Sequence, residues 1–391
     1  MKKTNLMLSI LVSSVLFLTS CGGIQNSESL IESDKTSNTS IGTTESATET
    51  PASSSDDATS IGESANLSYK IVDSKVTITG AVDSSVKDLT VPESIEGYEV
   101  SEIELGAFEE CDNLESIVIP FIGQKKEGLS YTNFAHIFGA PSFHSYGYKY
   151  LPDSLTSVAV TGGSTVAENA FSGCTNLTSI TIPNGVKRIE HSAFASCSSL
   201  TSFTIPESVT DIENAAFDSC IGLNSINIPD SVVSIGEDAF LSCVSLTSVS
   251  ISDSVTSIGD YSFSNCIKLD SITLSNSVTA IGDGAFNNCT NLVSVTLSNS
   301  LKSIGKYAFF GCPIVTVVIP ESVTSIGDEA FENSESMEKV YYMGNTASWE
   351  AIDIGSDNHQ LNSITLYYYS ETQPTESGNY WHYVDSNIVE W

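Results

Sequence analysis

A phenylalanine recurs at a fixed interval between residues 171 and 331 of this chain. The interval is 23 residues at every step except the last, where one residue is missing after Cys312 and the interval is 22. The repeated residues are Phe171, Phe194, Phe217, Phe240, Phe263, Phe286, Phe309 and Phe331. Repeats of this length are typical of solenoids, in which one unit cannot bury its apolar face alone and stacked units bury a common core.

Each repeat follows the pattern L-x-S-[IVF]-x-[IL]-[PS]-x-x-V-x-x-I-x-x-x-[AS]-F-x-x-C, as in Leu200 to Cys220. The first seven positions alternate between apolar and polar residues, which is typical of a half-buried strand. The Val, Ile and Ala-Phe positions indicate a second short extended or turn segment and one helical turn. We therefore predict a mainly β solenoid of the α/β-to-β type, a curved rod with short parallel strands on its concave face and turns or short helices on its convex side.

The repeat resembles the BspA-like class of leucine-rich repeats over roughly residues 95 to 340. As in that class, a cysteine follows the phenylalanine by three positions, whereas the asparagine of other leucine-rich repeats is largely absent. The segment from Phe134 to Tyr150 and the tail from Tyr367 to Asp385 also resemble parts of related surface proteins. The resemblance implies a cell-surface adhesion or recognition protein rather than an enzyme.

The N-terminus has the features of an export signal. Lys2 and Lys3 precede the apolar stretch Leu6 to Leu18, and the tetrapeptide L-T-S-C ends at Cys21. The tetrapeptide resembles a bacterial lipobox, so we predict a signal peptide over residues 1–20 and lipidation of Cys21. The alternative is an ordinary secreted protein that is cleaved elsewhere.

Changes in composition divide the rest of the chain. Residues 22 to 66 contain 18 Ser or Thr and no aromatic residue, a composition that cannot bury enough apolar surface to fold. We predict a disordered tether over 21–66, which serves as a spacer or carries glycans on its hydroxyls. An N-terminal cap follows over 67–94. The solenoid covers 95–342 and includes an insertion at 121–156, and a C-terminal cap covers 343–391.

The charge balance excludes one class of partner. The chain has 48 acidic and 15 basic residues, a formal net charge of −33, and Arg188 is its only arginine. Nucleic acid binding requires clustered Lys and Arg against the phosphates, so nucleic acid is excluded as a partner. The same deficit argues against a polybasic membrane patch, and we expect membrane contact through the lipid anchor alone.

The cysteines of an exported chain normally indicate disulfides, and here the repeat argues against them. Apart from Cys21, there are eight cysteines, seven of them each three residues after a repeat phenylalanine. Equivalent residues of stacked coils lie about 5 Å apart with parallel Cβ vectors, which does not suit a disulfide. We predict a buried ladder of free thiols with weak hydrogen bonds to turn amides. Zinc or iron–sulfur ligation is the alternative, and it lacks any C-x-x-C pair.

No motif supports catalysis. The five histidines occur without H-E-x-x-H, and G-x-S-x-G and P-loop patterns are missing from the sequence. We therefore expect no catalytic residues, no cofactor and no metal site. Weak calcium binding by acidic turns is left open.

Two surfaces are candidates for ligand binding. On the predicted strands the polar positions line outward columns of hydroxyls, which can hydrogen-bond a glycan or a peptide strand. The alternatives are that these side chains satisfy one another across the ladder, or order water as ice-binding solenoids do. The candidate residues are Ser179, Thr181, Ser202, Thr204, Ser225, Asn227, Ser248 and Ser250, and the columns continue through Ser271, Thr273, Ser294 and Thr296.

The second candidate is the insertion, which is rich in aromatic residues and contains several lysines and histidines. Phe134, Tyr146 and Tyr148 are its candidate ligand contacts, since recognition patches favour such residues. Against this, Phe134 and Phe138 are four apart, as expected if the insertion packs a helix of its own on the solenoid. The tryptophans Trp349, Trp381 and Trp391 indicate a cap or, alternatively, carbohydrate stacking.

Together these features predict a monomeric protein, lipid-anchored at the extracellular face of a bacterial cell membrane. It presents a concave surface to a protein or carbohydrate ligand outside the cell. The alternative is a non-catalytic, glycan-presenting or scaffold component of a polymer uptake or degradation system.

Overall fold

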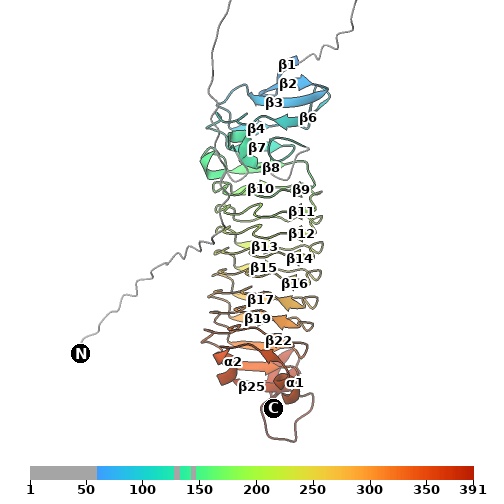
Figure 1. Ribbon diagram of the computed structural model, residues 1–391, viewed down its shortest axis with the longest axis vertical. Coiled ribbons are helices and arrows are strands. Elements are labelled where there is room, and N and C mark those ends of the chain that lie inside the picture. Colours follow the sequence, from blue (N-terminus) through green and yellow to red (C-terminus); the bar gives the residue numbers. More distant parts are fainter. Residues whose placement is uncertain (1–59, 127–132, 142–146) are drawn as a thin grey trace, which may run out of the picture. The chain divides into compact units, whose positions relative to one another are not determined.

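The computed structural model describes residues 60–126, 133–141 and 147–391, all within one compact unit, Asp56–Trp391. The predicted signal peptide, Cys21 and most of the tether lie outside the described residues. In Figure 1 the chain winds into stacked coils, with successive coils in sequence order from the blue to the red end. Each coil places one strand on either side of a shared core, so the fold is the predicted solenoid.

The first ladder of strands carries the predicted hydroxyl columns. Its strands are parallel and in register, so Ser225 lies beside Ser248 and Asn227 beside Ser250. At the position where most coils carry Ile or Val, one coil has Phe203, and there the ladder is reduced to a single bridge between Ser202 and Ser225. The strands are β4 (Asp88–Thr90), β7 (Ser116–Ile119), β8 (Ser157–Val160), β10 (Ser179–Thr181), β13 (Ser225–Asn227), β15 (Ser248–Ser250), β17 (Ser271–Thr273), β19 (Ser294–Thr296), β21 (Thr316–Ile319), β23 (Lys339–Tyr342) and β25 (Thr365–Tyr369).

The second ladder is one continuous parallel sheet of nine two-residue strands. Each strand contains the repeat Ile or its equivalent, which points inward, and the next residue begins a turn. The sequence left open whether this segment is extended or a turn, and the structure shows that it is extended. The strands are β9 (Thr165–Val166), β11 (Arg188–Ile189), β12 (Asp211–Ile212), β14 (Ser234–Ile235), β16 (Ser257–Ile258), β18 (Ala280–Ile281), β20 (Ser303–Ile304), β22 (Ser325–Ile326) and β24 (Asp353–Ile354).

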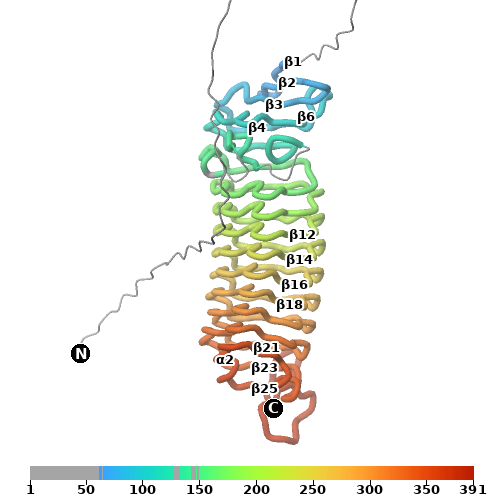
Figure 2. The backbone as a smooth tube through the Cα atoms, viewed as in Figure 1, coloured from blue at the N-terminus to red at the C-terminus, as the bar shows by residue number. Residues whose placement is uncertain are grey.

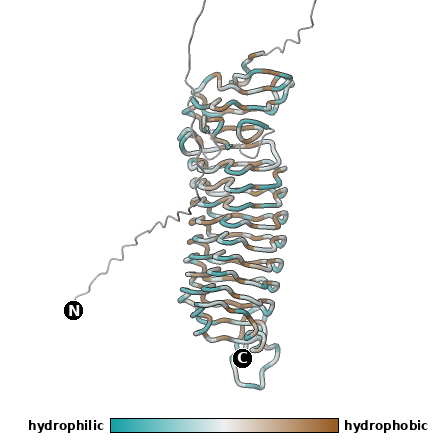
Figure 3. Tube along the Cα trace, viewed as in Figure 1, coloured by the Kyte–Doolittle hydropathy of each residue, from teal (hydrophilic) through white to brown (hydrophobic). Residues whose placement is uncertain are grey.

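The repeat phenylalanines form a continuous stack through the core. Neighbouring rings are nearly parallel, as for Phe217 and Phe240, whose centroids lie 5.3 Å apart with 2° between the ring planes. These rings are fully buried. Figure 3 shows the same order in the hydropathy, since apolar stretches recur at equivalent places in successive coils. One large ring per coil therefore fills the core along the stack.

The turn after the second strand is not a helical turn, and that prediction is wrong. The residues two before and two after each phenylalanine have positive φ, as at Ala215 (54°) and Ser219 (57°) around Phe217. Left-handed residues at this spacing interrupt α-helical geometry and produce a series of tight turns instead. The turns form a ladder of their own, because the amide of Phe217 donates to the carbonyl of Ala239 in the next coil at 2.8 Å.

The eight described cysteines are free and buried. The predicted thiol hydrogen bonds are present, but their acceptor is a carbonyl oxygen. The Sγ of Cys243 donates to the carbonyl of Phe217, 26 residues earlier, at 3.3 Å, and five other cysteines repeat this contact. Burial raises the pKa of the Cys220 and Cys243 thiols well above the ordinary value, which disfavours the reactive thiolate.

A mixed sheet of five strands, in which only one pair is parallel, occupies the N-terminal end, and it begins earlier than predicted. Residues 60–66 were assigned to the disordered tether, yet they form a strand and the turn that pairs it with the next strand. Backbone pairing orders this polar segment although it buries few side chains, and that is why composition did not reveal it. The strands are β1 (Ser60–Ser64), β2 (Leu67–Val72), β3 (Lys75–Ala81), β5 (Ser94–Ile95) and β6 (Tyr98–Ile103), and the parallel pair is β3 and β6.

The described part of the insertion is built into the stack. It contains two 3₁₀ helices, η1 (Phe134–Phe138) and η2 (Gly147–Lys149). The amide of Phe134 donates to the carbonyl of Ala170 at 2.7 Å, the same contact that links the regular turns. Its ring lies 5.3 Å from that of Phe171. The insertion thus supplies one irregular turn of the core, and η1 is the helix that the Phe134–Phe138 spacing predicts.

The C-terminal region continues both ladders beyond residue 342. Strand β25 pairs in parallel with β23, and β24 pairs with β22, so one more coil lies inside the predicted cap. The sequence missed this coil because it lacks the Phe and Cys positions. Two short helices, α1 (Thr346–Glu350) and α2 (His359–Ser363), fall within this coil, and the hairpin of β26 (Tyr380–Val384) and β27 (Asn387–Glu390) ends the sheet. Figure 2 shows the last coils as less regular than the preceding ones.

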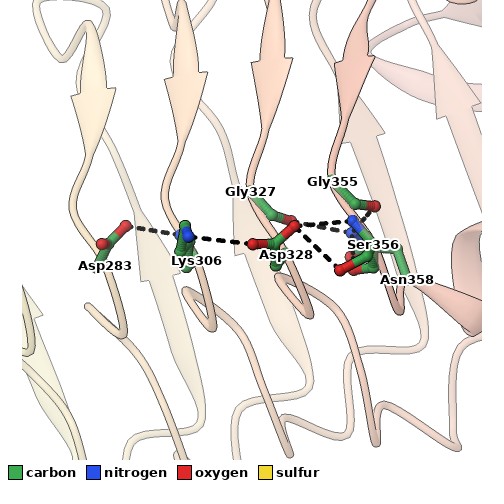
Figure 4. A network of polar contacts seen from close by, with 7 residues as sticks. All are labelled: Asp283, Lys306, Gly327, Asp328, Gly355, Ser356 and Asn358. Carbon is green, nitrogen blue, oxygen red and sulfur yellow. Dashed lines mark hydrogen bonds and ion pairs between the residues drawn. The ribbon is translucent and has the colours of Figure 1, made fainter.

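A row of polar contacts joins the last regular coils to this irregular coil (Figure 4). Asp283 accepts from the amide of Lys306 at 2.7 Å, and the Lys306 amine lies 3.1 Å from Asp328. Asp328 in turn accepts from the amide of Ser356 at 2.8 Å. The side-chain oxygen of Asn358 accepts from the amide of Phe331 at 3.1 Å, in place of the carbonyl used in earlier coils. Asn358 therefore ends the turn ladder.

Candidate functional site

The predicted hydroxyl columns are exposed and free of internal partners. All eight residues predicted on the strands have exposed side chains. Within the described residues, no hydrogen bond links any of these eight side chains to another group. The alternative that they satisfy one another across the ladder is therefore not what the structure shows. We call this surface, formed by the outward side chains of the first ladder, the strand face.

Two hollows of the strand face are candidate binding sites. The first, which we call the open hollow, has a volume of about 340 Å³ and contains four of the predicted residues, Ser179, Thr181, Ser202 and Thr204. Asn184 and Pro206, which follow the two strand segments, complete its polar rim. The structure therefore brings these predicted residues together in one shallow site. The other four lie along the same columns in the next two coils.

The second hollow was not predicted. It has a volume of about 550 Å³ and lies where β17, β19 and β21 end, and we call it the C-terminal groove. Thr273, Thr296 and Val318 line one side, and Tyr383 and Ile388 of the terminal hairpin line the other. Thr273 and Thr296 belong to the outward column that the repeat predicts, but the groove itself was not predicted. Nothing periodic points to Tyr383, because the hairpin lies outside the repeat.

The structure tests only one of the three ligand contacts that were predicted in the insertion. Phe134 is fully buried, so the prediction that it contacts a ligand from an exposed surface is wrong. Its ring is needed to continue the core stack between Phe138 and Phe171. Tyr146 and the side chain of Tyr148 lie outside the described residues, and their proposed role stays a prediction.

Carboxylates are concentrated in the turns rather than on the strand face. Asp218 and Asp238 occupy the turns around Phe217 and Phe240, and burial raises the pKa of both carboxyl groups. On the strand face, charged column residues occur at both ends of the first ladder. Asp88 accepts from the Ser116 hydroxyl, and Lys339 forms an ion pair with Glu390 of the hairpin. The open hollow is lined by uncharged residues alone. The surface between the turns is therefore close to neutral despite the net charge of the chain.

Two searches of the described residues gave negative results. In that part of the chain, no group of three or more His, Cys, Asp or Glu side chains is arranged to hold a metal ion. In the same residues, no helix has the length and apolar character needed to cross a membrane.

Comparison with solved structures agrees with the fold. A leucine-rich repeat protein from Bacteroides ovatus is 24% identical, with a TM-score of 0.53 over 78% of this chain and 70% of that one. A leucine rich cell surface protein from Faecalibacterium prausnitzii is 23% identical, with a TM-score of 0.35 over 76% of this chain and 98% of that one. Only the first similarity is close enough to bear on the fold, and it bears on the fold alone.

A search of curated proteins found no match. The family model described as "BspA type Leucine rich repeat region" matches in six copies, at residues 81–136, 142–269, 211–338 and 256–368. These ranges cover well over half of the sequence and include the irregular coil before the terminal hairpin. The chain therefore belongs to the BspA-type leucine-rich repeat family.

Proposed function

We propose that this protein is a non-catalytic recognition or adhesion protein of the bacterial cell surface, which binds protein or glycan ligands through its strand face. The observation that carries the proposal is the set of exposed, unpaired hydroxyl and amide side chains along two columns of the first ladder. Unpaired polar groups on a fixed scaffold are available to a ligand without first breaking internal hydrogen bonds. The nearly neutral surface suits an uncharged partner better than a strongly charged one.

The proposed location rests on the sequence. The lipobox-like tetrapeptide ending at Cys21 supports a diacylated anchor, and two acyl chains give stable membrane attachment. The Ser/Thr-rich segment that follows would then separate the folded unit from the membrane. Metabolic labelling with an alkyne fatty acid tests the anchor. Label on the parent chain that is lost in Cys21→Ala supports it, and an unlabelled parent chain contradicts it.

A second candidate function is a glycan-presenting or scaffold component of a polymer uptake or degradation system. The open-ended C-terminal groove favours it, since a chain of sugars could pass through such a groove. The two functions differ in whether a second protein takes part. The scaffold role requires a transporter or hydrolase next to the bound polymer, whereas adhesion requires the ligand alone. Crosslinking in intact cells separates them, because the scaffold role requires a transporter or hydrolase beside this protein.

The main test is binding of the purified full chain to immobilised extracellular matrix proteins and to a glycan array. A matched pair of lysine substitutions then locates the binding surface. Thr204→Lys places a long charged side chain on the strand face, whereas Thr256→Lys places it at an exposed position beside the second ladder. We expect the first variant to lose most of the binding and the second to keep it. Equal binding by both variants would place the ligand elsewhere.

A further inference from the structure

The terminal hairpin reaches back along the stack. In the order of the sheet, β26 is five strands away from β17, about 24 Å at the usual strand spacing of roughly 4.8 Å. Nevertheless Tyr383 of β26 and Thr273 of β17 line the same groove. The hairpin pairs with β25 at two positions and also folds back over the ends of the intervening strands. This fold turns an exposed part of the strand face into a groove with two sides.

Specific contacts hold the hairpin in this position. Trp381 is fully buried, and its indole N–H donates to the carbonyl of Tyr342 at 3.0 Å. Near the end of β27, Glu390 accepts from the Tyr341 hydroxyl at 2.7 Å and forms an ion pair with Lys339. Lys339 and Tyr341 occupy the two outward columns in β23. The hairpin is therefore fastened to the same columns that carry hydroxyls in earlier coils.

Tyr383 presents a fixed aromatic ring to the groove. Its ring meets that of Trp381 edge to face at a centroid distance of 4.9 Å and lies 6.4 Å from that of Tyr369. The side chain is still 43% exposed, so part of the ring is open to a ligand. A ring held by its neighbours loses little conformational entropy on binding.

The opposite side of the groove is rich in hydroxyl and amide groups. Thr273, Asn276, Thr296 and Asn299 are exposed along it. Ser275 adds a buried hydroxyl for which the described part of the chain provides no hydrogen-bond partner. The equivalent hydroxyl in the next coil, Ser298, accepts from the amide of Ser300 at 3.1 Å. Unpaired buried hydroxyls also occur outside the groove, at Ser231 and Ser262.

The lining also limits the charge of the ligand. Asp253 is the one carboxylate among the residues that line the groove, and the described lining contains no Lys, Arg or His. An anionic ligand would meet no cation and one like charge, which is unfavourable. A neutral ligand with many hydroxyls can instead donate to Asp253 and exchange hydrogen bonds with the asparagines.

The groove also favours a sugar chain over a peptide strand. The lining strands β19 and β21 are paired in parallel on both sides, and β17 is paired with β19 on one side, so most of their backbone groups are already occupied. A peptide would find mainly side chains there and would leave many of its own N–H and C=O groups unpaired. A sugar ring carries its polar groups around its edge and C–H bonds on its faces, and those faces can pack on an aromatic ring.

The groove is open at one end. A neighbouring hollow of about 400 Å³ continues the groove, because both are lined by Asn299, Pro320 and Met343. The groove alone is within the range of about 300–1,000 Å³ that is usual for small-ligand sites. The space therefore suits a few sugar units of a longer chain rather than a single enclosed sugar.

We propose that the C-terminal groove binds a short stretch of a neutral glycan, with one sugar ring packed on Tyr383 and its hydroxyls bonded to Thr273, Thr296 and Asn299. This inference rests on the proposed function and assigns one of its ligand classes, neutral glycans, to a separate part of the strand face. The terminal hairpin is then a part of the binding site.

The test measures binding of the full chain to maltoheptaose, cellohexaose, mannohexaose and a heparin hexasaccharide by isothermal titration calorimetry. We expect at least one neutral oligosaccharide to bind and the heparin fragment not to bind. Tyr383→Ala should weaken that binding by at least about tenfold, whereas Tyr383→Phe keeps the ring and should stay within about twofold. Thermal unfolding of each variant checks that the fold is intact.

Two threonine variants separate the groove from the surface beside the second ladder. Thr296→Val removes one hydroxyl inside the groove at nearly constant shape and should weaken binding by roughly two- to tenfold. Thr256→Val removes an exposed hydroxyl beside the second ladder, away from the strand face, and should leave the affinity unchanged. This pair remains informative if Tyr383→Ala disturbs the hairpin.

The outcomes distinguish this inference from the proposed function. If a neutral oligosaccharide binds and Tyr383→Ala and Thr296→Val leave its affinity unchanged, the groove is not the site, although the recognition function stands. If no oligosaccharide binds and a matrix protein binds in a way that Tyr383→Ala disrupts, the groove holds a peptide, and the glycan assignment is wrong. Failure of the full chain to bind either class overturns both.

Discussion

The open hollow and the C-terminal groove lie on the same columns of the same ladder, yet they differ as binding sites. The open hollow is formed by strand residues and the loops that follow them, such as Thr204 and Pro206. The C-terminal groove begins with equivalent threonines, Thr273 and Thr296, and adds a second side with an aromatic ring from the hairpin. The difference shows that the repeat supplies a neutral polar surface and that a segment outside the repeat gives this surface depth.

The coils beneath the two sites are nearly the same. Under the open hollow, Cys220 donates to the carbonyl of Phe194 at 3.2 Å, and under the C-terminal groove Cys289 makes the same contact to Phe263 at 3.2 Å. The core therefore contributes little to the difference between the sites. If the core contributes equally to both sites, changes to the hairpin should affect only the C-terminal groove. Equivalent changes to the core should affect the groove and the open hollow equally.

The largest expected effect follows removal of the residue that fastens the hairpin. Trp381→Ala deletes a fully buried ring and its hydrogen bond to Tyr342, and large-to-small changes of this kind cost about 3–5 kcal/mol. We expect the hairpin to detach while the coils remain folded, which would make the groove resemble the open hollow. Hydrogen exchange measures this as fast exchange across residues 380–390 and unchanged protection in β12 to β18.

Trp391→Ala is the matched control for this experiment. Trp391 is 45% exposed and stacks on His382, so its loss should cost much less. Slow exchange of the hairpin in Trp381→Ala would show that other contacts hold the hairpin and would weaken the comparison.

A smaller and equal effect is expected at two cysteines of the core. Cys220→Ala and Cys289→Ala each remove a buried thiol and one of the two hydrogen bonds that a phenylalanine carbonyl accepts, at an expected cost of about 1–2 kcal/mol in the free energy of unfolding. The carbonyls of Phe194 and Phe263 keep the bond from a backbone amide. Because both residues make the same contact in equivalent coils, the two costs should agree within about 0.5 kcal/mol. Denaturant unfolding monitored by circular dichroism measures both.

The reactivity of the thiols provides a separate check on the ladder. In the Cys21→Ala chain, native protein should react slowly with a thiol reagent, and denatured, unreduced protein should expose eight reactive thiols, the number that is buried in the described residues. Few free thiols after denaturation would mean that disulfides are present and would contradict the ladder.

The smallest expected effects are two changes in stability with pH that have opposite signs. In the coils, burial raises the folded pKa of Asp218, so its ionisation destabilises the folded state at neutral pH. In the hairpin, hydrogen bonds from Lys339 and Tyr341 lower the folded pKa of Glu390, so its ionisation stabilises the folded state. Asp218→Asn should raise the melting temperature at pH 7, and Glu390→Gln should lower it.

The differences in melting temperature between each variant and the parent chain should disappear in acid, and they should do so over different ranges of pH. The gain from Asp218→Asn shrinks as the pH falls through the raised folded pKa and vanishes below the ordinary value of 3.8, where the aspartate is protonated in both states. The loss from Glu390→Gln shrinks below the ordinary value of 4.5 and vanishes once the pH is below the lowered folded pKa. Melting curves of the three proteins from pH 7 to pH 3 measure this. A pH-independent difference for either variant would rule out ionisation as its cause.

The periodic part of the fold was predictable because every repeat has the same pattern of apolar and polar residues. The spacing of Phe217 and Phe240 gives the stack, and the alternation around Ser225 gives a strand whose polar residues point outward. Each coil contacts residues about 23 positions away, so one register repeated many times determines both the core and the exposed columns. The eight column residues were identified in this way, and all of them are exposed.

The departures from prediction share one cause, which is that their partners lie outside the repeat. Phe134 was taken for a surface residue because the insertion breaks the period, yet its ring continues the core stack. The coil after residue 342 lacks the Phe signal, and Asn358 supplies its hydrogen bond instead. The one local signal that went unused is the Gly, Asn or Ser two residues after each phenylalanine, which suits a left-handed backbone.

The sequence by itself determined that this chain forms a solenoid with a polar, uncharged strand face, since both follow from contacts that repeat with the chain. Only the tertiary structure decided where that face becomes a groove. The deciding contact is the hydrogen bond from Trp381 to the carbonyl of Tyr342, 39 residues apart, and no periodic pattern encodes this separation. A single long-range contact of this kind depends on how the last strands bend, and the bend is set by packing between segments that are remote in the sequence.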